Sequence, residues 1–356
     1  MSQLTYAPMK PNKVPYSIPM PNNMGVIRYI LAFGVVISHF QILSGYTFWW
    51  PLSSYSCVGG FFALSGFLIY GSFLKKKSLG KYLISRAIRI MPAYWITVLF
   101  FAVLLGAVST LPVAQYFGSA GFWKYLVCNL LFANFAAPTL PGVFTGLPME
   151  AVNGSLWTMK VEWFLYLTPP VVALLIRRFK MRPTVMFALI YVLACVYRIA
   201  FVHLYDQTGK EIYNILSRQF MGQLSYFYAG VLCYYWYDAL MRWRWWLLGA
   251  SAVALVFIYD IPHGYIVLHP LAVSIIVILC SMMGKWGTWE GKRDNVSYNI
   301  YLIHFPVIQL VVSLGPGMGP VGALVSSIAG TVLLACLLNI LEIRIRRRCM
   351  ARLNRS

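Results

Sequence analysis

The chain has 356 residues, of which 60% are hydrophobic and only 11% are charged, and its mean hydropathy is +0.69. Soluble domains are about a quarter charged, so this composition excludes an ordinary soluble protein and predicts an all-α polytopic membrane protein. A net charge of +20 would suggest nucleic acid as the partner of a soluble protein. Here the positions of the charges suggest membrane topology instead, and we expect membrane lipid and no nucleic acid as a partner.

The distribution of apolar residues divides the chain into three predicted parts. Residues 1–23 are polar and rich in proline, without the apolar core of a signal peptide, and predict a cytosolic lead-in. Residues 24–343 predict the transmembrane domain, and residues 344–356 a basic cytosolic tail. The seven cysteines include no CxxC pair and lie mainly in apolar segments, so we expect neither a disulfide framework nor a metal site.

Ten hydrophobic stretches predict about ten transmembrane helices around an internal polar chamber. They cover roughly 24–44, 57–74, 90–111, 155–176, 183–203, 220–238, 245–260, 264–283, 296–314 and 321–343. With the N-terminus inside, 23 of the 29 lysines and arginines fall in cytosolic segments. This asymmetry favours cytosolic N- and C-termini.

The first stretch carries Arg28 and His39. Eleven residues at 100° each place them about 20° apart around a helix, and about 16 Å apart along it. Ionisable residues inside a span are costly and usually face a polar cavity, so this helix predicts one wall of the chamber. The alternative is an arginine that reaches the interface and a histidine that only bonds another helix.

Two basic residues precede the third stretch. Arg86 and Arg89 are three apart and therefore share a helical face at the predicted cytosolic surface. Arginine forks bind phosphate oxygens in a bidentate manner, which suits a phosphate-bearing ligand. Contact with anionic lipid headgroups is the alternative.

The fourth stretch has a polar face made of Ser155, Thr158, Glu162 and Tyr166. Glu162 and His39 both lie near the outer third of the bilayer in the predicted topology. A carboxylate beside an imidazole can fix its tautomer, as in a general base. The alternative is a buried ion pair of Glu162 with Arg198 or Lys160.

The ninth stretch repeats this pattern with Ser297, Tyr301 and His304, and its second intramembrane histidine favours a chamber. The outer segment 112–153 is the longest predicted loop, and its aromatic and amide groups suit either a carbohydrate site or an aromatic belt. Asn153 begins a glycosylation sequon. The scattered His203, His263 and His269 are a poor metal signal.

Five segments occur in an order that resembles the integral-membrane acyltransferase family 3, in its stand-alone form, over about 24–343. They are 28–39, 61–69, 86–95, 155–166 and 297–306. The family often has acidic residues at two positions where this chain has Gly59 and the pair Gly25 and Val26.

The resemblance implies an O-acyltransferase that modifies an envelope or secreted carbohydrate of the O-antigen, capsule or exopolysaccharide type, either free or linked to a lipid. The implied donor is an acyl-CoA, usually acetyl-CoA, that enters from the cytosol of a bacterial cell, so the protein would span the plasma (inner) membrane. No metal is implied.

The resemblance also implies roles for particular residues. His39 would act as general base or form a transient acyl-histidine, and Glu162 would orient it. Arg86 and Arg89 would hold the phosphates of coenzyme A, with Arg28 deeper along the same path. The residues expected to line the acceptor chamber are Trp157, Tyr166, Tyr301 and His304.

A transporter or a lipid-linked glycan translocase is the main alternative, because it would also need an internal polar path. An inert sensor or scaffold is a third. Cleavage of a thioester by the purified protein separates the enzyme from both.

Overall fold

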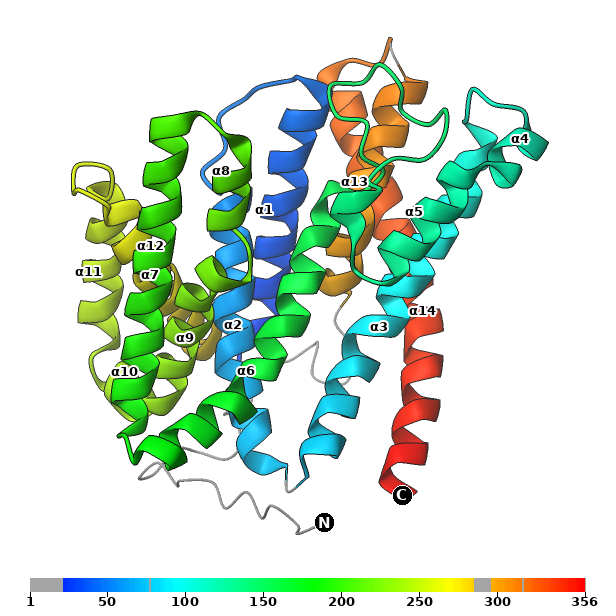
Figure 1. Cartoon of the computed structure of the whole chain (residues 1–356). Helices are drawn as coiled ribbons and strands as arrows, with labels where there is room; N and C mark the ends of the chain where they lie inside the picture. Colours follow the sequence, from blue (N-terminus) through cyan, green and yellow to red (C-terminus); the bar gives the residue numbers. More distant parts are fainter. Residues whose placement is uncertain (1–21, 77, 285–295, 316, 356) are drawn as a thin grey trace. The chain divides into compact units, whose positions relative to one another are not determined.

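The computed structural model describes residues 22–76, 78–284, 296–315 and 317–355, and in these ranges it contains helices and no strand (Figure 1). The all-α prediction is therefore confirmed. Most of the predicted lead-in lies outside the described residues. The predicted basic tail continues the last helix through Arg355.

Among the described residues, eight helical segments are long and apolar enough to cross a membrane. They contain helices α1 (Met24–Ser44), α2 (Ser54–Lys75), α3 (Leu79–Leu104), α6 (Trp157–Phe179), α7 (Pro183–Thr208), α12 (Gly264–Met282), α13 (Ser297–Leu314) and α14 (Pro320–Arg355). Each overlaps a hydrophobic stretch of the sequence, although α3 begins at Leu79 and not near residue 90 as predicted. The protein is a multi-pass membrane protein.

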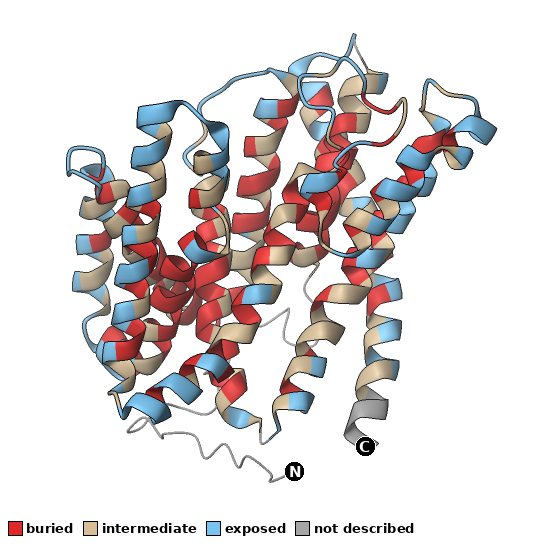
Figure 2. Cartoon of the chain, viewed as in Figure 1, coloured by how far each residue is buried: buried red, intermediate tan, exposed pale blue. Residues whose placement is uncertain are grey.

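The two other predicted spans are shorter helices. Helix α9 (Phe220–Tyr235) has 16 residues and α11 (Arg244–Val256) has 13. At 1.5 Å per residue these rise about 24 Å and about 20 Å, less than the hydrocarbon core of about 30 Å. Helix α9 is buried along most of its length (Figure 2), so its apolar side chains face other helices. The number of spans, ten, and the cytosolic location of the two termini stay predictions.

The remaining described elements are short. They are η1 (Leu105–Ala107), α4 (Val113–Gly118), α5 (Ala120–Leu130), η2 (Asn134–Ala136), η3 (Gly154–Leu156), α8 (Glu211–Ser217) and α10 (Tyr237–Arg242). Five of them (η1, α4, α5, η2 and η3) lie in the segment between α3 and α6. The predicted outer loop 112–153 therefore contains helices of its own, of which α5 is the longest.

The chain divides into two compact units. The first consists of the described residues of Met1–Leu31, Tyr55–Ile84 and Val161–Lys292, and the second of those of Ala32–Ser54, Ser85–Lys160 and Arg293–Ser356. Helices α1, α3 and α6 contribute residues to both. Arg28 and His39 lie on the continuous helix α1, as predicted.

In the first unit, small residues let α2 and α9 approach closely. A methyl group at Gly66 would overlap the carbonyl oxygen of Phe227, and one at Gly230 would overlap that of Ala63. Without a strong hydrophobic drive between helices in lipid, such backbone contact is a main source of association. The small-residue run of the second span therefore packs on α9. The first span also packs against the second, because Leu31 of α1 contacts Gly60 of α2.

We expect Gly66→Ala to destabilise the protein by about 1–3 kcal/mol, because the added methyl group must push α2 away from the backbone of α9. The measurement is the thermal unfolding midpoint in detergent. Gly249→Ala is the matched control, since a methyl group there meets nothing within 4 Å. Equal midpoints for the two variants would contradict the close α2–α9 contact.

Candidate active site

Two histidines of the second unit face each other. Nδ1 of His39 on α1 lies 2.7 Å from Nε2 of His304 on α13. Their ring planes lie within 4° of each other and their centroids are 5.0 Å apart, so the rings meet edge to edge along this hydrogen bond. His304 is fully buried, His39 is partly accessible, and the ring of Phe305 packs edge-on against His39 at 5.5 Å. The structure thus brings together the expected base and one of the residues expected to line the acceptor chamber, and their roles stay predictions.

The hydrogen bonds of the pair fix where its protons lie. Nδ1 of His304 is 2.7 Å from the carbonyl oxygen of Tyr301. A carbonyl only accepts, so this nitrogen carries the proton and Nε2 of neutral His304 holds a lone pair. Nδ1 of His39 must then donate to that lone pair. In the neutral pair, Nε2 of His39 is left with a lone pair of its own, as a general base requires.

The side chain of Tyr301 is held by the start of the fourth span. Its hydroxyl lies 2.8 Å from Oγ1 of Thr158, and Thr158 in turn donates to the carbonyl oxygen of Ser155 at 2.9 Å. Thr158 therefore accepts from Tyr301. The polar stripes predicted on the fourth and ninth spans meet at this hydroxyl pair.

The segment before α6 is fastened to α13 by Asn153. Its Nδ2 donates to the carbonyl oxygen of Leu302 at 2.8 Å, and its Oδ1 accepts from the backbone and hydroxyl of Ser155 at 3.2 and 2.6 Å. The side chain thus caps η3, the 3₁₀ turn that leads into α6. The position of Asn153 just before a helix is a sequence signal for a helix cap. In the sequence alone, Asn153 was interpreted only as the start of a sequon.

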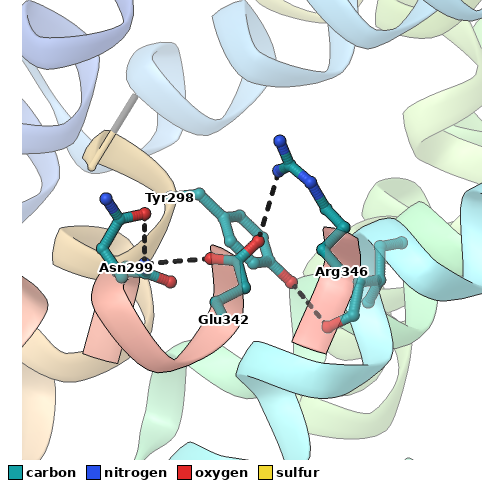
Figure 3. Close-up of polar contacts among 6 residues, drawn as sticks. Tyr298, Asn299, Glu342 and Arg346 are labelled. Carbon is teal, nitrogen blue, oxygen red and sulfur yellow. Dashed lines mark hydrogen bonds and ion pairs between the residues drawn. The ribbon is translucent and has the colours of Figure 1, made fainter. Parts of the chain in front are cut away.

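The first turns of α13 are held to α14 through buried polar groups (Figure 3). Asn299 donates to the carboxylate of Glu342 at 3.0 Å, and Arg346 pairs with the same carboxylate at 3.5 Å. Asn299 also lies 3.3 Å from Oδ1 of Asn339. These contacts fix the rotation of α13, which carries Tyr301 and His304.

One of the two predicted phosphate-binding arginines lies beside the same helix. The guanidinium of Arg89 stands over the ring of Tyr298 at 5.8 Å, and the Tyr298 hydroxyl donates to the carbonyl oxygen of Ile90 at 3.3 Å. Tyr298 precedes His304 by six residues, about 9 Å along the helix axis. Arg86 lies one turn before Arg89, and its Nε is 3.4 Å from Oγ of Ser85.

The remaining predicted residues are Glu162, Tyr166, Arg28 and Trp157. Glu162 belongs to the first unit, where its carboxylate accepts from the hydroxyl of Tyr166 and from Ser65 at 3.5 Å. Arg28 is half-buried in the first unit and Trp157 half-buried at the start of α6. The orienting group that the structure shows for His39 is His304; the expected pairing of His39 with Glu162 stays a prediction.

Comparison with known proteins decides the family. The model of an acyltransferase domain, that of acyltransferase family 3, matches residues 22–340. The chain belongs to this family. The acyltransferase is 25% identical to nodulation protein 10 of Rhizobium leguminosarum bv. viciae over 83% of this chain and 84% of that protein. It is 24% identical to an O-acetyl transferase of Shigella phage Sf6 over 82% and 86% of the two chains. No solved structure matches it significantly.

Four of the five segments that carry the resemblance contribute to the second unit of the acyltransferase. His39, Arg89, Thr158 and His304 come from four of them, and each has a contact there that involves α13. The fifth, around Ser65, lies in the first unit with Glu162.

Proposed function

We propose that this acyltransferase moves an acyl group from acyl-CoA on the cytosolic side to a hydroxyl of an envelope or secreted carbohydrate. The first candidate for the acyl group is acetyl. The cell would be bacterial and the membrane its plasma membrane. The observation that carries the proposal is the chain of contacts from Tyr301 through His304 to His39. The likeness to an O-acetyl transferase supports the reaction type.

In the proposed step, Nε2 of His39 takes the proton of the acceptor hydroxyl while the hydroxyl oxygen attacks the thioester carbonyl carbon. The carbon–sulfur bond then breaks, the acyl group stays on the acceptor oxygen, and the thiolate of coenzyme A takes the proton back from the imidazolium. His304 stabilises the imidazolium by accepting from Nδ1 of His39 throughout. A transient acyl group on His39 itself is the mechanistic alternative.

Arg86 and Arg89 would hold the phosphates of the donor. Both side chains are half-buried near the start of α3, at the cytosolic surface in the predicted topology. The spacing of about 9 Å along α13 from Tyr298, which Arg89 covers, to His304 can be spanned by the flexible pantetheine arm. Phosphates at the arginines would thus be compatible with a thioester at the imidazole pair. Arg28 and Glu162 are proposed as secondary contributors.

A transporter would also need buried polar groups. It has no need of an imidazole whose proton is directed by a second imidazole and a carbonyl. Because this relay leaves one nitrogen as a base, acyl transfer is the function that the geometry supports best.

We expect His39→Ala to lower acetyl-CoA turnover by at least about 10²-fold, because the base is lost. Free thiol release by detergent-purified protein with an envelope-glycan acceptor is the measurement. His203→Ala, a change at an exposed histidine, is the control. His304→Phe should lower kcat with little change in the donor KM, and His304→Gln, which still offers an acceptor to His39, should retain more activity. Normal turnover in a folded His39→Ala protein would refute the proposal.

The donor site is tested with two thioesters. Acetyl-CoA and acetyl-pantetheine share the reacting group, but only the first carries phosphates. We expect Arg86→Gln combined with Arg89→Gln to raise the KM for acetyl-CoA at least about tenfold and to leave acetyl-pantetheine unchanged, because charge-assisted phosphate bonds are lost. Arg178→Gln, at an exposed arginine at the end of α6, is the control. An unchanged preference for acetyl-CoA in the double variant would mean that the phosphates bind elsewhere.

A further inference from the structure

A second buried polar cluster lies within the first unit, and its residues are not those of the proposed active site. Its centre is Arg198 on α7, which is only 3% exposed. Nε and Nη1 of this arginine have no hydrogen-bond partner among the described residues. The groups around it include Cys195 and three tyrosines, and its guanidinium stands over the ring of Tyr55 at 5.5 Å.

This arginine remains charged under all ordinary conditions. Taking an ionised group out of water without a partner is costly, and an aromatic face offsets only part of that cost. An oxyanion would offset the rest, because guanidinium N–H groups donate charge-assisted hydrogen bonds to carboxylate or phosphate oxygens. Unpaired buried N–H groups on a guanidinium therefore indicate a ligand rather than a structural role.

Further polar groups lie beside the arginine. His269 on α12 lies 2.9 Å from Oγ of Ser56 through Nε2 and 2.6 Å from the hydroxyl of Tyr226 through Nδ1. The hydroxyl of Tyr55 is buried close to that of Tyr226. The cluster therefore places tyrosine hydroxyls and a histidine beside the unused guanidinium donors.

A row of tyrosines leads from the surface to this centre. Tyr259 is 79% exposed and stacks on Tyr265 with centroids 5.5 Å apart. Tyr265 stacks on Tyr55 at 5.0 Å, and Tyr55 meets the edge of buried Tyr226 at 5.9 Å. Ligand sites combine aromatic walls with a few fixed polar groups in this way.

The packing of α2 preserves this arrangement. Tyr226 lies against Gly59, and any side chain at position 59 would overlap its ring. Tyr55 and Ser56 lie in the first turn of α2, and Tyr265 in the first turn of α12. Both helices begin at the outer surface in the predicted topology, which is the side from which a carbohydrate acceptor would come.

We propose that the Arg198 cluster binds the oxyanion of an anionic sugar, either the carboxylate of an acidic sugar or the phosphate of a sugar phosphate. Arg198 would hold the anion, and the edges of Tyr55 and Tyr265, whose faces are covered by their neighbours, would flank the sugar, with exposed Tyr259 at the outer end of the row. That this sugar is part of the acceptor rests on the proposed function; the binding itself does not.

The test is binding, measured without any acyl donor as ligand-dependent thermal stabilisation of the full chain in detergent. The probes are glucuronate, glucose 6-phosphate, inorganic phosphate and uncharged glucose. We expect glucuronate, glucose 6-phosphate or both to stabilise the wild type. The one that binds more tightly shows whether the anion is a carboxylate or a phosphate. Arg198→Gln should weaken this binding at least about tenfold. Arg242→Gln, the same change at an exposed arginine of the first unit, should leave it unchanged.

Arg198→Gln should also fold, and without ligand should unfold no earlier than the wild type, because it removes an unpaired buried charge. Tyr265→Ala should weaken the binding of the anionic sugar but not of inorganic phosphate. Equal stabilisation by glucose, or binding that survives Arg198→Gln, would overturn the proposal. Because no acyl transfer is measured, a negative result here leaves the proposed reaction intact, and loss of turnover in His39→Ala leaves this site intact.

Discussion

The hydrogen bond between His39 and His304 is the interaction on which the proposed chemistry depends. An isolated histidine in a span could be a structural bond between helices. Here the partner is a second imidazole whose other nitrogen is already committed to the carbonyl oxygen of Tyr301. That commitment directs both protons and leaves one nitrogen of His39 available as a base.

The surrounding contacts hold α13 in the rotation that this relay needs. Asn299 binds Glu342 at one end of the helix, and Asn153 binds the carbonyl oxygen of Leu302 near its middle. Thr158 meets the hydroxyl of Tyr301 between them. Polar side chains inside a membrane protein need partners, so each of these bonds satisfies buried groups and also sets the position of an imidazole.

Much of this could be predicted from the sequence. Hydropathy located the eight long helices, and the spacing of Arg28 and His39 placed both on one helix. For α9 and α11 the predicted spans stay untested: both helices are shorter than the hydrocarbon core is thick, and α9 is buried along most of its length. The pairing of His304 with His39 was not predicted, since they are 265 positions apart and contact depends on how α13 packs. His269 was set aside as a scattered histidine because Ser56 and Tyr226, its partners, come from two other helices.

The central claim is tested most directly by the imidazole nitrogen-15 resonances of histidine-labelled protein in detergent. The chain has only five histidines, so single His→Gln variants suffice to assign His39 and His304. The account predicts that both rings are neutral near pH 7 and carry their proton on Nδ1, with Nε2 unprotonated. A proton on Nε2 of His304 would contradict it, because that nitrogen could not then accept from His39 and the relay would not exist.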